Sequence, residues 1–433
     1  MPTHMSNLRR LALFVFLAVA SHCSAQTLAR PGWAGSGMSG EPWWRHAILY
    51  QLDPKSFSPE GLRGVSKRLD YIQSLGADAI LLDGITSGNI DSSIGTMDDL
   101  DDLIHQASSR NIRVLISLDP KANDLEALAR LWLTHGLAGF RVPGATPDQF
   151  ASLKKLLSSF VGQRILINDL DPANPPANTQ SGSSQLLADP RPGTVPQLAA
   201  AAVRPALEAS QALIDSGHLT SLLFSDGPAL ARSFTRYGDG SHDVAIAKTL
   251  AAVLLATRSG SLLYYGQELG LASAPAEGPV PSIHWDAPPK VKPAPGQPPP
   301  PPPPAITPAG ANVALEDADP TSLLNWYRQL SALHHSNRTI SSGDQIILNH
   351  DGDNVLAWVR KPRAVSLQTP AIVIVSNLSA QPVTLSLKAD MQRLHLHGSF
   401  LRLLLRSDTG MGAIHVDGMT IAPYTVYIGE LRY

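Results

Sequence analysis

The sequence predicts an α/β protein, a (β/α)8 TIM barrel followed by a C-terminal antiparallel β-sandwich domain. From about Trp43 onward, short apolar runs alternate with helical segments, a pattern typical of βα units and a parallel sheet. About eight such units follow one another, the number that closes a barrel. After Gly343 the pattern changes to short alternating runs separated by turn residues, which is typical of antiparallel strands. The runs expected to form these strands are 346–351 (IILNHD), 354–361 (NVLAWVRK), 371–379 (AIVIVSNLS), 383–389 (VTLSLKA) and 425–433 (TVYIGELRY).

Each expected barrel strand is a short apolar run. In chain order the runs are 47–52 (AILYQL), 78–84 (DAILLDG), 112–118 (IRVLISL), 138–142 (AGFRV), 164–169 (RILIND), 185–189 (QLLAD), 219–226 (LTSLLFSD) and 261–266 (SLLYYG). Parallel strands buried on both faces are nearly continuous in apolar residues. The runs therefore favour strands inside a covered barrel wall.

Segments with helical spacing separate these runs. In the first, 64–76, one face of the helix is formed by Val65, Leu69, Ile72 and Leu75. The other expected helices are 97–111, 125–136, 147–162, a helix near 195–216, 245–260 and a last amphipathic helix at 321–336. The acids that open 97–111 suit the positive end of a helix dipole.

The domain boundaries follow from these patterns. We expect the barrel to occupy residues 42–342 and the C-terminal β-domain residues 343–433. A proline-rich insertion at 288–310 contains seven consecutive prolines, Pro298 to Pro304, which favour polyproline II over helix or central strand. We interpret the insertion as a stiff, exposed segment, and the alternative is a site for a polyproline-binding partner.

The first 25 residues have the pattern of a secretory signal peptide. Arg9 and Arg10 precede the apolar run 11–20 (LALFVFLAVA), which is too short to span a bilayer, and small residues end at Ala25. The alternative is a buried N-terminal helix. We expect a secreted or periplasmic protein with a flexible leader at 26–41 and no membrane span.

Composition excludes several functional classes. The chain has 433 residues, 43% of them hydrophobic, and a formal net charge of −2 with interspersed acids and bases, which gives no sign of a nucleic-acid partner. The single cysteine, Cys23, lies within the expected signal peptide. Disulfides, cysteine nucleophiles and thiolate metal sites are therefore excluded from the mature chain. The histidines show no metal-ligand spacing, and we expect no metal and no cofactor.

Several segments resemble glycoside hydrolase family 13, which includes the α-amylases and α-glucosidases. The opening WWRHAILYQLDPKSF (43–57) and the run AGFRV (138–142) resemble the family's first segment and fourth strand. Residues 245–271 resemble its seventh helix and eighth strand, and PSIHWD (281–286) and 312–333 resemble its oligo-1,6-glucosidase and α-glucosidase branch. The resemblance implies a (β/α)8 barrel with a C-terminal β-domain and an α-linked oligosaccharide as ligand.

The resemblance also identifies degenerate catalytic positions. Members of this family use an aspartate nucleophile after strand four, a glutamate acid after strand five and a stabilising aspartate after strand seven. The nucleophile position here is Pro143, which has no carboxylate. Asp169, one methylene shorter than glutamate, stands at the acid position, and Asp226 stands at the stabiliser position.

Arg141, Tyr50 and Tyr265 stand at positions where the resemblance implies substrate binding. Each retained polar residue also has a structural interpretation. Arg141 could pair with a buried acid such as Asp169 or Asp226. Asp226 could cap the following helix, Asp169 could be a turn acid, and Tyr265 could belong to the packing of the barrel rim.

Other departures concern the walls of the site. Phe224 and Ser225 replace the Asn-His pair that usually precedes the stabiliser, which removes a sugar-hydroxyl ligand. The chain passes directly from 112–118 to 125–136, which leaves no room for the family's inserted B domain.

These losses predict an exported α-amylase-family protein of carbohydrate metabolism that is catalytically impaired and binds α-glucosides or a partner. The alternative is an active α-glucosidase-type retaining glycosidase with a rewired nucleophile. In that case a carboxylate would come from another strand end, at Asp83, Asp119 or Asp171.

Overall fold

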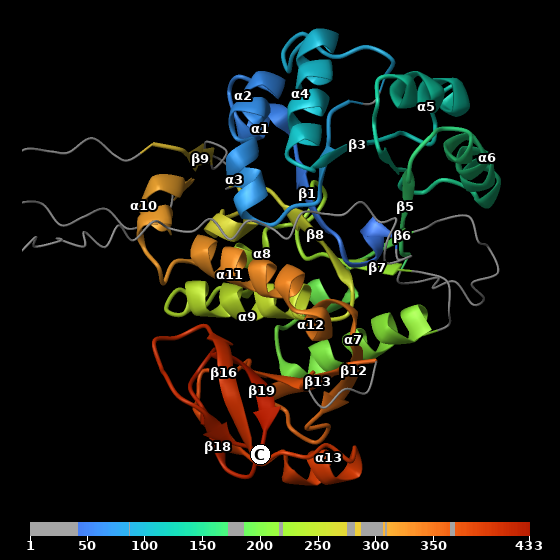
Figure 1. Ribbon diagram of the computed structural model, residues 1–433. Helices are drawn as coiled ribbons and strands as arrows, with labels where there is room; N and C mark the ends of the chain where they lie inside the picture. The colour runs from blue at the N-terminus through green and yellow to red at the C-terminus, as the bar shows by residue number, and fades with distance from the viewer. Residues whose placement is uncertain are drawn as a thin grey trace, which may run out of the picture. The chain divides into compact units, whose positions relative to one another are not determined.

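The computed structural model describes residues 42–85, 87–171, 186–215, 220–274, 282–286, 306–307, 310–363 and 369–433 (Figure 1). The expected signal peptide, 1–25, and leader, 26–41, lie outside the described residues. So do 288–305 and 308–309 of the proline-rich insertion. These expectations therefore stay predictions.

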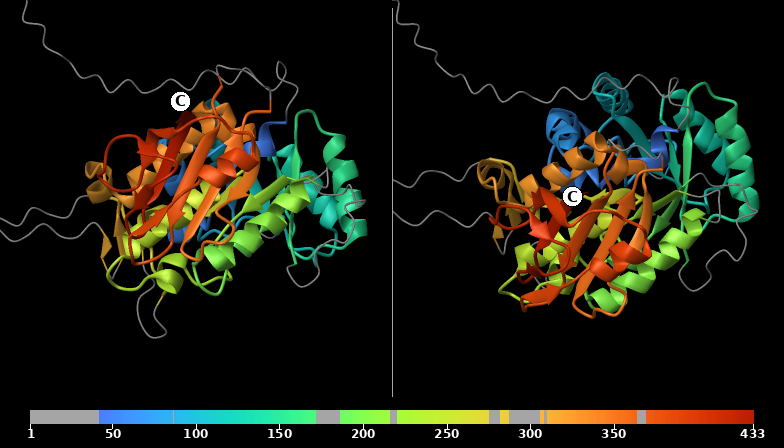
Figure 2. Two further views of the ribbon diagram at one scale, coloured as in Figure 1. Left: turned by 90° about the horizontal axis from the view of Figure 1, so that it is seen from below. Right: turned by 60° about the horizontal axis from the view of Figure 1, so that its bottom comes forward.

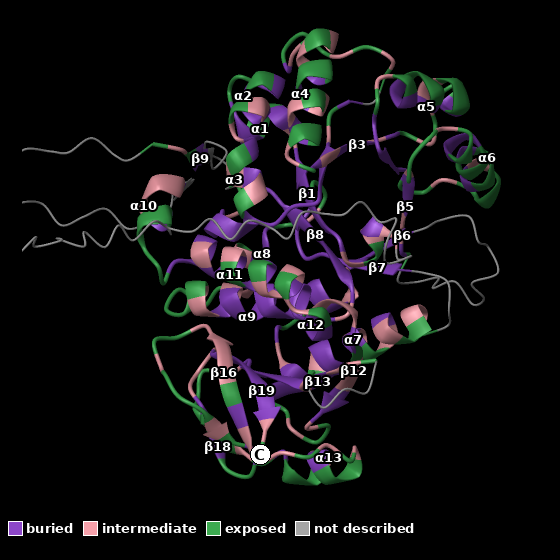
Figure 3. Cartoon of the chain, in the orientation of Figure 1, coloured by how far each residue is buried: buried purple, intermediate pink, exposed green. Residues whose placement is uncertain are grey.

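Eight parallel strands close a barrel, as the alternating pattern predicted (Figure 1). Strand order around the wall follows chain order, so each βα unit lies beside the next. The strands are β1 (Ile48–Leu52), β2 (Ala79–Leu82), β3 (Arg113–Ser117), β4 (Gly139–Arg141), β5 (Ile165–Asp169), β6 (Leu186–Asp189), β7 (Thr220–Leu223) and β8 (Gly260–Tyr264). Nearly all of their side chains are buried, whereas the outer faces of the helices are exposed (Figure 3).

The helices connect and cover these strands. Those of the barrel region are η1 (Trp43–His46), α1 (Pro54–Phe57), α2 (Leu62–Lys67), α3 (Leu69–Ser74), α4 (Met97–Ser109), α5 (Leu125–Thr134), α6 (Pro147–Ser158), η2 (Arg191–Gly193), α7 (Ala200–Asp215), α8 (Ser233–Tyr237), α9 (Asp243–Leu255), η3 (Gln267–Leu269), α10 (Val313–Ala318), α11 (Leu323–Ser336) and α12 (Arg338–Ser342). The single helix predicted over 64–76 is instead two short helices, because the backbone of Arg68 leaves the helical region. Residues 118–124 alone connect β3 to α5, as the direct passage predicted.

Capping fixes the starts of two helices on the outer ring. The Thr96 side chain accepts a hydrogen bond from the backbone N–H of Asp99, and the Asp99 carboxylate accepts one from the N–H of Thr96. Thr146 and Gln149 form the same reciprocal pair at the start of α6. Each cap satisfies backbone donors that a helix leaves unpaired, and a lost cap costs about 1 kcal/mol.

Gly139 allows β4 to approach β5 closely. Its φ is +151°, and a Cβ at this position would lie 2.0 Å from the backbone oxygen of Ile165. Any other residue would therefore push the two strands apart. The close approach matters for function because β4 and β5 end in Arg141 and Asp169.

The C-terminal domain is antiparallel, as the sequence predicted. A six-stranded sheet has the order β12-β13-β14-β19-β16-β17, and a two-stranded sheet pairs β15 with β18. The elements are β12 (Asp344–Leu348), β13 (Val355–Lys361), β14 (Ile372–Asn377), β15 (Val383–Leu385), α13 (Lys388–Arg393), β16 (Phe400–Arg406), β17 (Ile414–His415), β18 (Met419–Ile421) and β19 (Val426–Arg432). The expected strand 383–389 ends early, since α13 begins within it.

Contacts between helices and the C-terminal sheet join the two parts of the chain. Helices α7 and α9 lie against β13 and β19, and Figure 2 shows the orange and red strands beside them. The indole of buried Trp358, on β13, donates a hydrogen bond to the carbonyl of Ala256 at the end of α9, at 3.1 Å. A separate three-stranded sheet consists of β9 (Ser282–His284), β10 (Ile306–Thr307) and β11 (Gly310–Asn312). Across the described ranges, no helix is both long and apolar enough to cross a membrane.

Candidate active site at the carboxyl ends of the strands

Arg141 and Asp169 form a bidentate ion pair at the carboxyl end of the barrel. Arg141 is the last residue of β4 and Asp169 the last of β5, and these strands are parallel neighbours. The guanidinium donates from Nε to Oδ1 at 2.8 Å and from Nη2 to Oδ2 at 2.7 Å. The Arg141 side chain is 9% exposed and that of Asp169 is 30% exposed. This pairing explains a lone arginine in a buried strand, because a buried guanidinium requires a counter-charge.

The ion pair continues into a chain of hydrogen bonds across neighbouring strands. Nη1 of Arg141 donates to Oε1 of Gln51, on β1, at 3.0 Å. The Gln51 amide nitrogen then donates to both oxygens of Asp83, at 2.8 and 3.0 Å, and the Ser117 hydroxyl also donates to Asp83, at 3.0 Å. The glutamine amide therefore links a cation to an anion, its oxygen toward Arg141 and its nitrogen toward Asp83.

Asp83 follows β2 and is the second carboxyl group of this network. Burial raises its pKa, and the hydrogen bonds from Gln51 and Ser117 and the charge of Arg141 oppose that rise. A raised pKa is one property of a carboxyl group that acts as a general acid. The sequence singled out Asp83 only as an alternative carboxylate and did not single out Gln51. The signal that could have identified Asp83 as a site residue is its position directly after an apolar run.

Asp226 has partners other than this network. Its side chain is 1% exposed, and Oδ1 accepts hydrogen bonds from the backbone N–H of Ser233 at 2.9 Å and from the Ser225 hydroxyl at 3.0 Å. The Arg236 guanidinium lies 3.8 Å from the same oxygen. Ser233 is the first residue of α8, so Asp226 caps that short helix. In the part of the chain that is described, no hydrogen bond or ion pair joins Asp226 to the Arg141–Asp169 pair.

Pro143 stands just beyond β4 and is exposed. The backbone N–H of Val142 still donates to the carbonyl of Ile167, at 3.1 Å, and the chain then turns at Gly144, whose φ is +72°. A proline fits at the point where the ladder ends, because it has no N–H to donate. The position where the resemblance implies a nucleophile therefore offers no carboxylate.

Tyr50 is fully buried, and its hydroxyl donates to Oε1 of Glu268 at 2.6 Å. The hydroxyl of Tyr71 donates to the same oxygen at 2.7 Å. Burial raises the pKa of the Glu268 carboxyl, which these two hydrogen bonds oppose. Tyr50 therefore holds an internal acid and presents no surface to a ligand in this conformation.

Tyr265 packs at the rim of the barrel. Its carbonyl accepts a hydrogen bond from Nη1 of Arg232 at 2.6 Å, and that guanidinium lies 4.7 Å from the Tyr265 ring and 4.3 Å from the ring of Tyr264. The side chain is 6% exposed. These contacts match the structural interpretation of Tyr265 as part of the packing of the rim.

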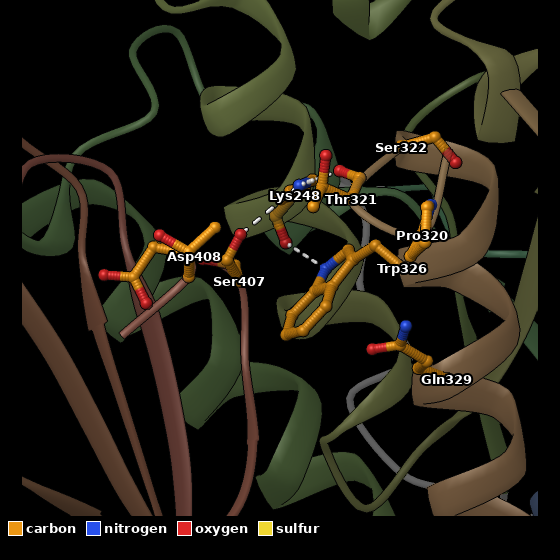
Figure 4. A pocket seen from close by; sticks show the side chains of 9 residues that line it. Lys248, Pro320, Thr321, Ser322, Trp326, Gln329, Ser407 and Asp408 are labelled. Carbon is orange, nitrogen blue, oxygen red and sulfur yellow. Dashed lines mark hydrogen bonds between the residues drawn. The ribbon is translucent and has the colours of Figure 1, made fainter. Parts of the chain in front are cut away.

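A cavity of about 300 Å³ lies away from the barrel mouth, between α9, α11 and the residues that follow β16 (Figure 4). The buried ammonium of Lys248 donates to the carbonyls of Thr321 at 2.6 Å and Ser407 at 3.3 Å, and the Trp326 indole donates to the Lys248 carbonyl at 3.0 Å. Burial lowers the pKa of Lys248. Since the ammonium already holds two chain segments together, we interpret this cluster as structural. Within the described ranges, no cluster of three or more His, Cys, Asp or Glu side chains is arranged to hold a metal ion.

Curated relatives match a limited stretch of the chain. Trehalose-6-phosphate hydrolase of Escherichia coli (strain K12) is 39% identical over 95 residues, which are 18% of this chain and 17% of that protein. Probable oligo-1,6-glucosidase 2 of Bacillus subtilis (strain 168) is 37% identical over 93 residues, 17% of each chain. The aligned stretch thus spans about a sixth of the curated relatives' length. No protein-family model matches the chain.

Solved structures match the fold over most of the chain. The trehalose-6-phosphate hydrolase of Bacillus licheniformis superposes with a TM-score of 0.75 at 16% identity, covering 91% of this chain and all of the other. Isomaltulose synthase from Klebsiella sp. LX3 gives a TM-score of 0.71 at 18% identity, covering 90% of this chain and all of the other. The likeness at this identity is one of fold. Sequence and fold together confirm the resemblance of this chain to glycoside hydrolase family 13, in its oligo-1,6-glucosidase and α-glucosidase branch.

Proposed function

We propose that this chain is a catalytically impaired homologue of the α-amylase family, which binds α-glucosides at the carboxyl end of its barrel. The observation that carries the proposal is the bidentate Arg141–Asp169 pair next to an exposed Pro143. A retaining glycosidase needs one carboxylate to attack the anomeric carbon and a second carboxyl group, about 5–5.5 Å away, to protonate the leaving oxygen.

The three expected positions do not supply these groups. Pro143 has no carboxylate. Both oxygens of Asp169 accept hydrogen bonds from one guanidinium, so this carboxylate serves as the counter-charge of Arg141. Asp226 is buried and caps α8. A sugar at the carboxyl end of the barrel would therefore contact hydrogen-bonding groups, but no carboxylate stands after β4 to attack it.

Binding of an α-glucoside rests on two supports. Relatives bear the names oligo-1,6-glucosidase and glucan 1,6-alpha-glucosidase. The barrel mouth also has a partly exposed carboxylate, Asp169, and half-buried polar groups at Asp83 and Ser117, which suit sugar hydroxyls. Export of the protein to an extracytoplasmic compartment is part of the proposal and rests on the pattern of residues 1–25.

A second candidate function is hydrolysis by a rewired pair of carboxyl groups. Asp83, with a raised pKa, and Asp169 belong to one hydrogen-bonded network through Gln51 and Arg141. This arrangement would assign the acid to Asp83 and the nucleophile to Asp169.

The two functions are separated by measuring turnover and binding together. We expect no hydrolysis of p-nitrophenyl α-glucoside or maltose at high protein concentration, and calorimetric binding of maltose or isomaltose that Asp169→Asn weakens. The exposed acid Asp102, in the outer helix α4, provides the matched control, Asp102→Asn, which should bind as the parent does. Turnover that Asp83→Asn abolishes would establish the rewired enzyme instead. Absence of both turnover and binding would reject both functions.

A further inference from the structure

A cavity at the opposite end of the barrel is lined, among the described residues, by two cations and by no acid. It encloses about 340 Å³ between η1, α6 and the start of β5, and its lining includes Trp44, Lys154, Leu157, Ser158 and Arg164. Arg164 directly precedes β5, whereas the Arg141–Asp169 pair stands where β4 and β5 end. The cavity is therefore separate from the candidate active site.

The Arg164 guanidinium lacks a counter-charge. In the part of the chain that is described, it makes no ion pair or hydrogen bond, and its Nε is buried without a partner. Burial lowers the pKa of Arg164. A buried guanidinium donor without an acceptor is costly, since desolvation of a charged donor is not offset. An incoming oxyanion would remove that cost.

A second cation adds to the positive potential of the cavity. Lys154 is exposed and lines the same cavity. Arg113, whose guanidinium lies 4.0 Å from the centre of the Trp43 ring, has its pKa lowered by burial and by the charge of Arg164, whereas the charge of Asp78 opposes this. Arg113 therefore has an acid near it and is not counted among the cations of the cavity. Clustered like charges without an acid in the lining attract anions.

The remaining lining is apolar and aromatic. Trp44 is half-buried and Leu157 is buried. A volume of this size lies within the usual range for small-molecule sites, which combine an apolar wall with a few polar anchors. Two cations favour a doubly charged group over a carboxylate, and guanidinium geometry matches a phosphate in a bidentate manner.

We propose that this cavity binds a small phosphate monoester, with the phosphate between Arg164 and Lys154 and the organic part against Trp44. The site goes beyond the proposed function, because it lies at the other end of the barrel and needs no sugar at the mouth.

The test is calorimetric titration of the full chain with phenyl phosphate. We expect binding with a dissociation constant below about 1 mM that weakens with added salt. Arg164→Gln and Lys154→Gln should each weaken binding about tenfold or more. Lys155→Gln is the matched control, because Lys155 is the next residue on the same exposed helix turn and does not line the cavity.

Trp44→Leu separates the two parts of the ligand. It should weaken phenyl phosphate binding and leave inorganic phosphate binding unchanged. Circular dichroism and thermal unfolding of each variant establish that it is folded. Arg164→Gln removes a half-buried charge whose Nε has no partner, so it should not lower Tm. The proposal is overturned if phenyl phosphate does not bind at about 10 mM, if the Arg164→Gln and Lys154→Gln double variant binds like the parent, or if Lys155→Gln loses as much affinity as Lys154→Gln.

Discussion

Glu316→Gln should stabilise the protein at neutral and alkaline pH and change little in acid. Glu316 lies in α10 and is 1% exposed. Its Oε2 accepts a hydrogen bond from the backbone N–H of Leu324 at 2.9 Å, while its Oε1 is buried without a partner. Burial raises the pKa of Glu316 from 4.5 to about 7, with a further contribution from the charge of Glu268.

The sign of the pH dependence follows from this shift. The folded pKa is above the unfolded value, so the folded state binds more protons than the unfolded state between these two values. The protonated side chain is favourable below the unfolded pKa, and this contribution is lost as pH rises through the folded pKa. The difference of about 2.5 units corresponds to about 3 kcal/mol at pH values above both.

Glutamine retains the shape of the side chain and an acceptor for Leu324, without the buried charge. We expect Glu316→Gln to match the parent Tm near about pH 5 and to exceed it by about 4 °C near about pH 8, from the usual unfolding entropy per residue. The control is Asp317→Asn, at the next position of the same helix, where the carboxylate is 58% exposed and pairs with Arg328. It should show no such gain. A Tm difference for Glu316→Gln that is the same at both pH values would refute the reasoning.

Three further outcomes test the barrel and its mouth. Arg141→Gln should lower the free energy of unfolding, measured in urea, by about 3 kcal/mol, because it leaves Asp169 without its cation. Arg130→Gln, which removes an exposed ion pair, should lower it by less than about 1 kcal/mol. Pro143→Asp alone should not produce hydrolysis of p-nitrophenyl α-glucoside, and combination with Asp169→Glu should give weak turnover at best, since catalytic groups act as a unit; full activity in the single variant would contradict this. Deletion of 291–305 should shift Tm by only a few degrees, because consecutive prolines cannot join a sheet ladder, and loss of soluble protein would show that the insertion supports the fold.

The barrel could be predicted because each of its strands is a buried apolar run followed by an amphipathic helix. The C-terminal domain was less predictable from sequence. Strand β16 was missed, since its run FLRLLLR lacks clean alternation and five of its side chains are only half-buried. The segment after β15 was wrongly expected to continue as a strand, because six residues of α13 give too short a window for a helical period.

The candidate site was partly predictable for a similar reason. The ends of neighbouring parallel strands must be adjacent, so Arg141 and Asp169 could be expected to meet. The orientation of Asp226 depends on the turn that leads to α8, and no periodic pattern encodes that turn. Gln51 was missed because a glutamine inside an apolar run has no chemical signature until its two partners are known.

The ion pair at the mouth sets a condition on any ligand that binds there. A sugar hydroxyl that donates a hydrogen bond to Asp169 must share that carboxylate with Arg141, which already donates to both oxygens. The Arg141 side chain is only 9% exposed, so separating the pair would leave a buried guanidinium without its anion, which costs several kcal/mol. A ligand is therefore favoured when it leaves the Arg141–Asp169 pair intact. It would then donate hydrogen bonds to the lone pairs of the carboxylate that do not face Arg141. Such binding does not require Asp169 to change its protonation state, whereas acid catalysis does. The same contacts that hold β4 and β5 together at their ends thus favour recognition over hydrolysis in the function proposed here.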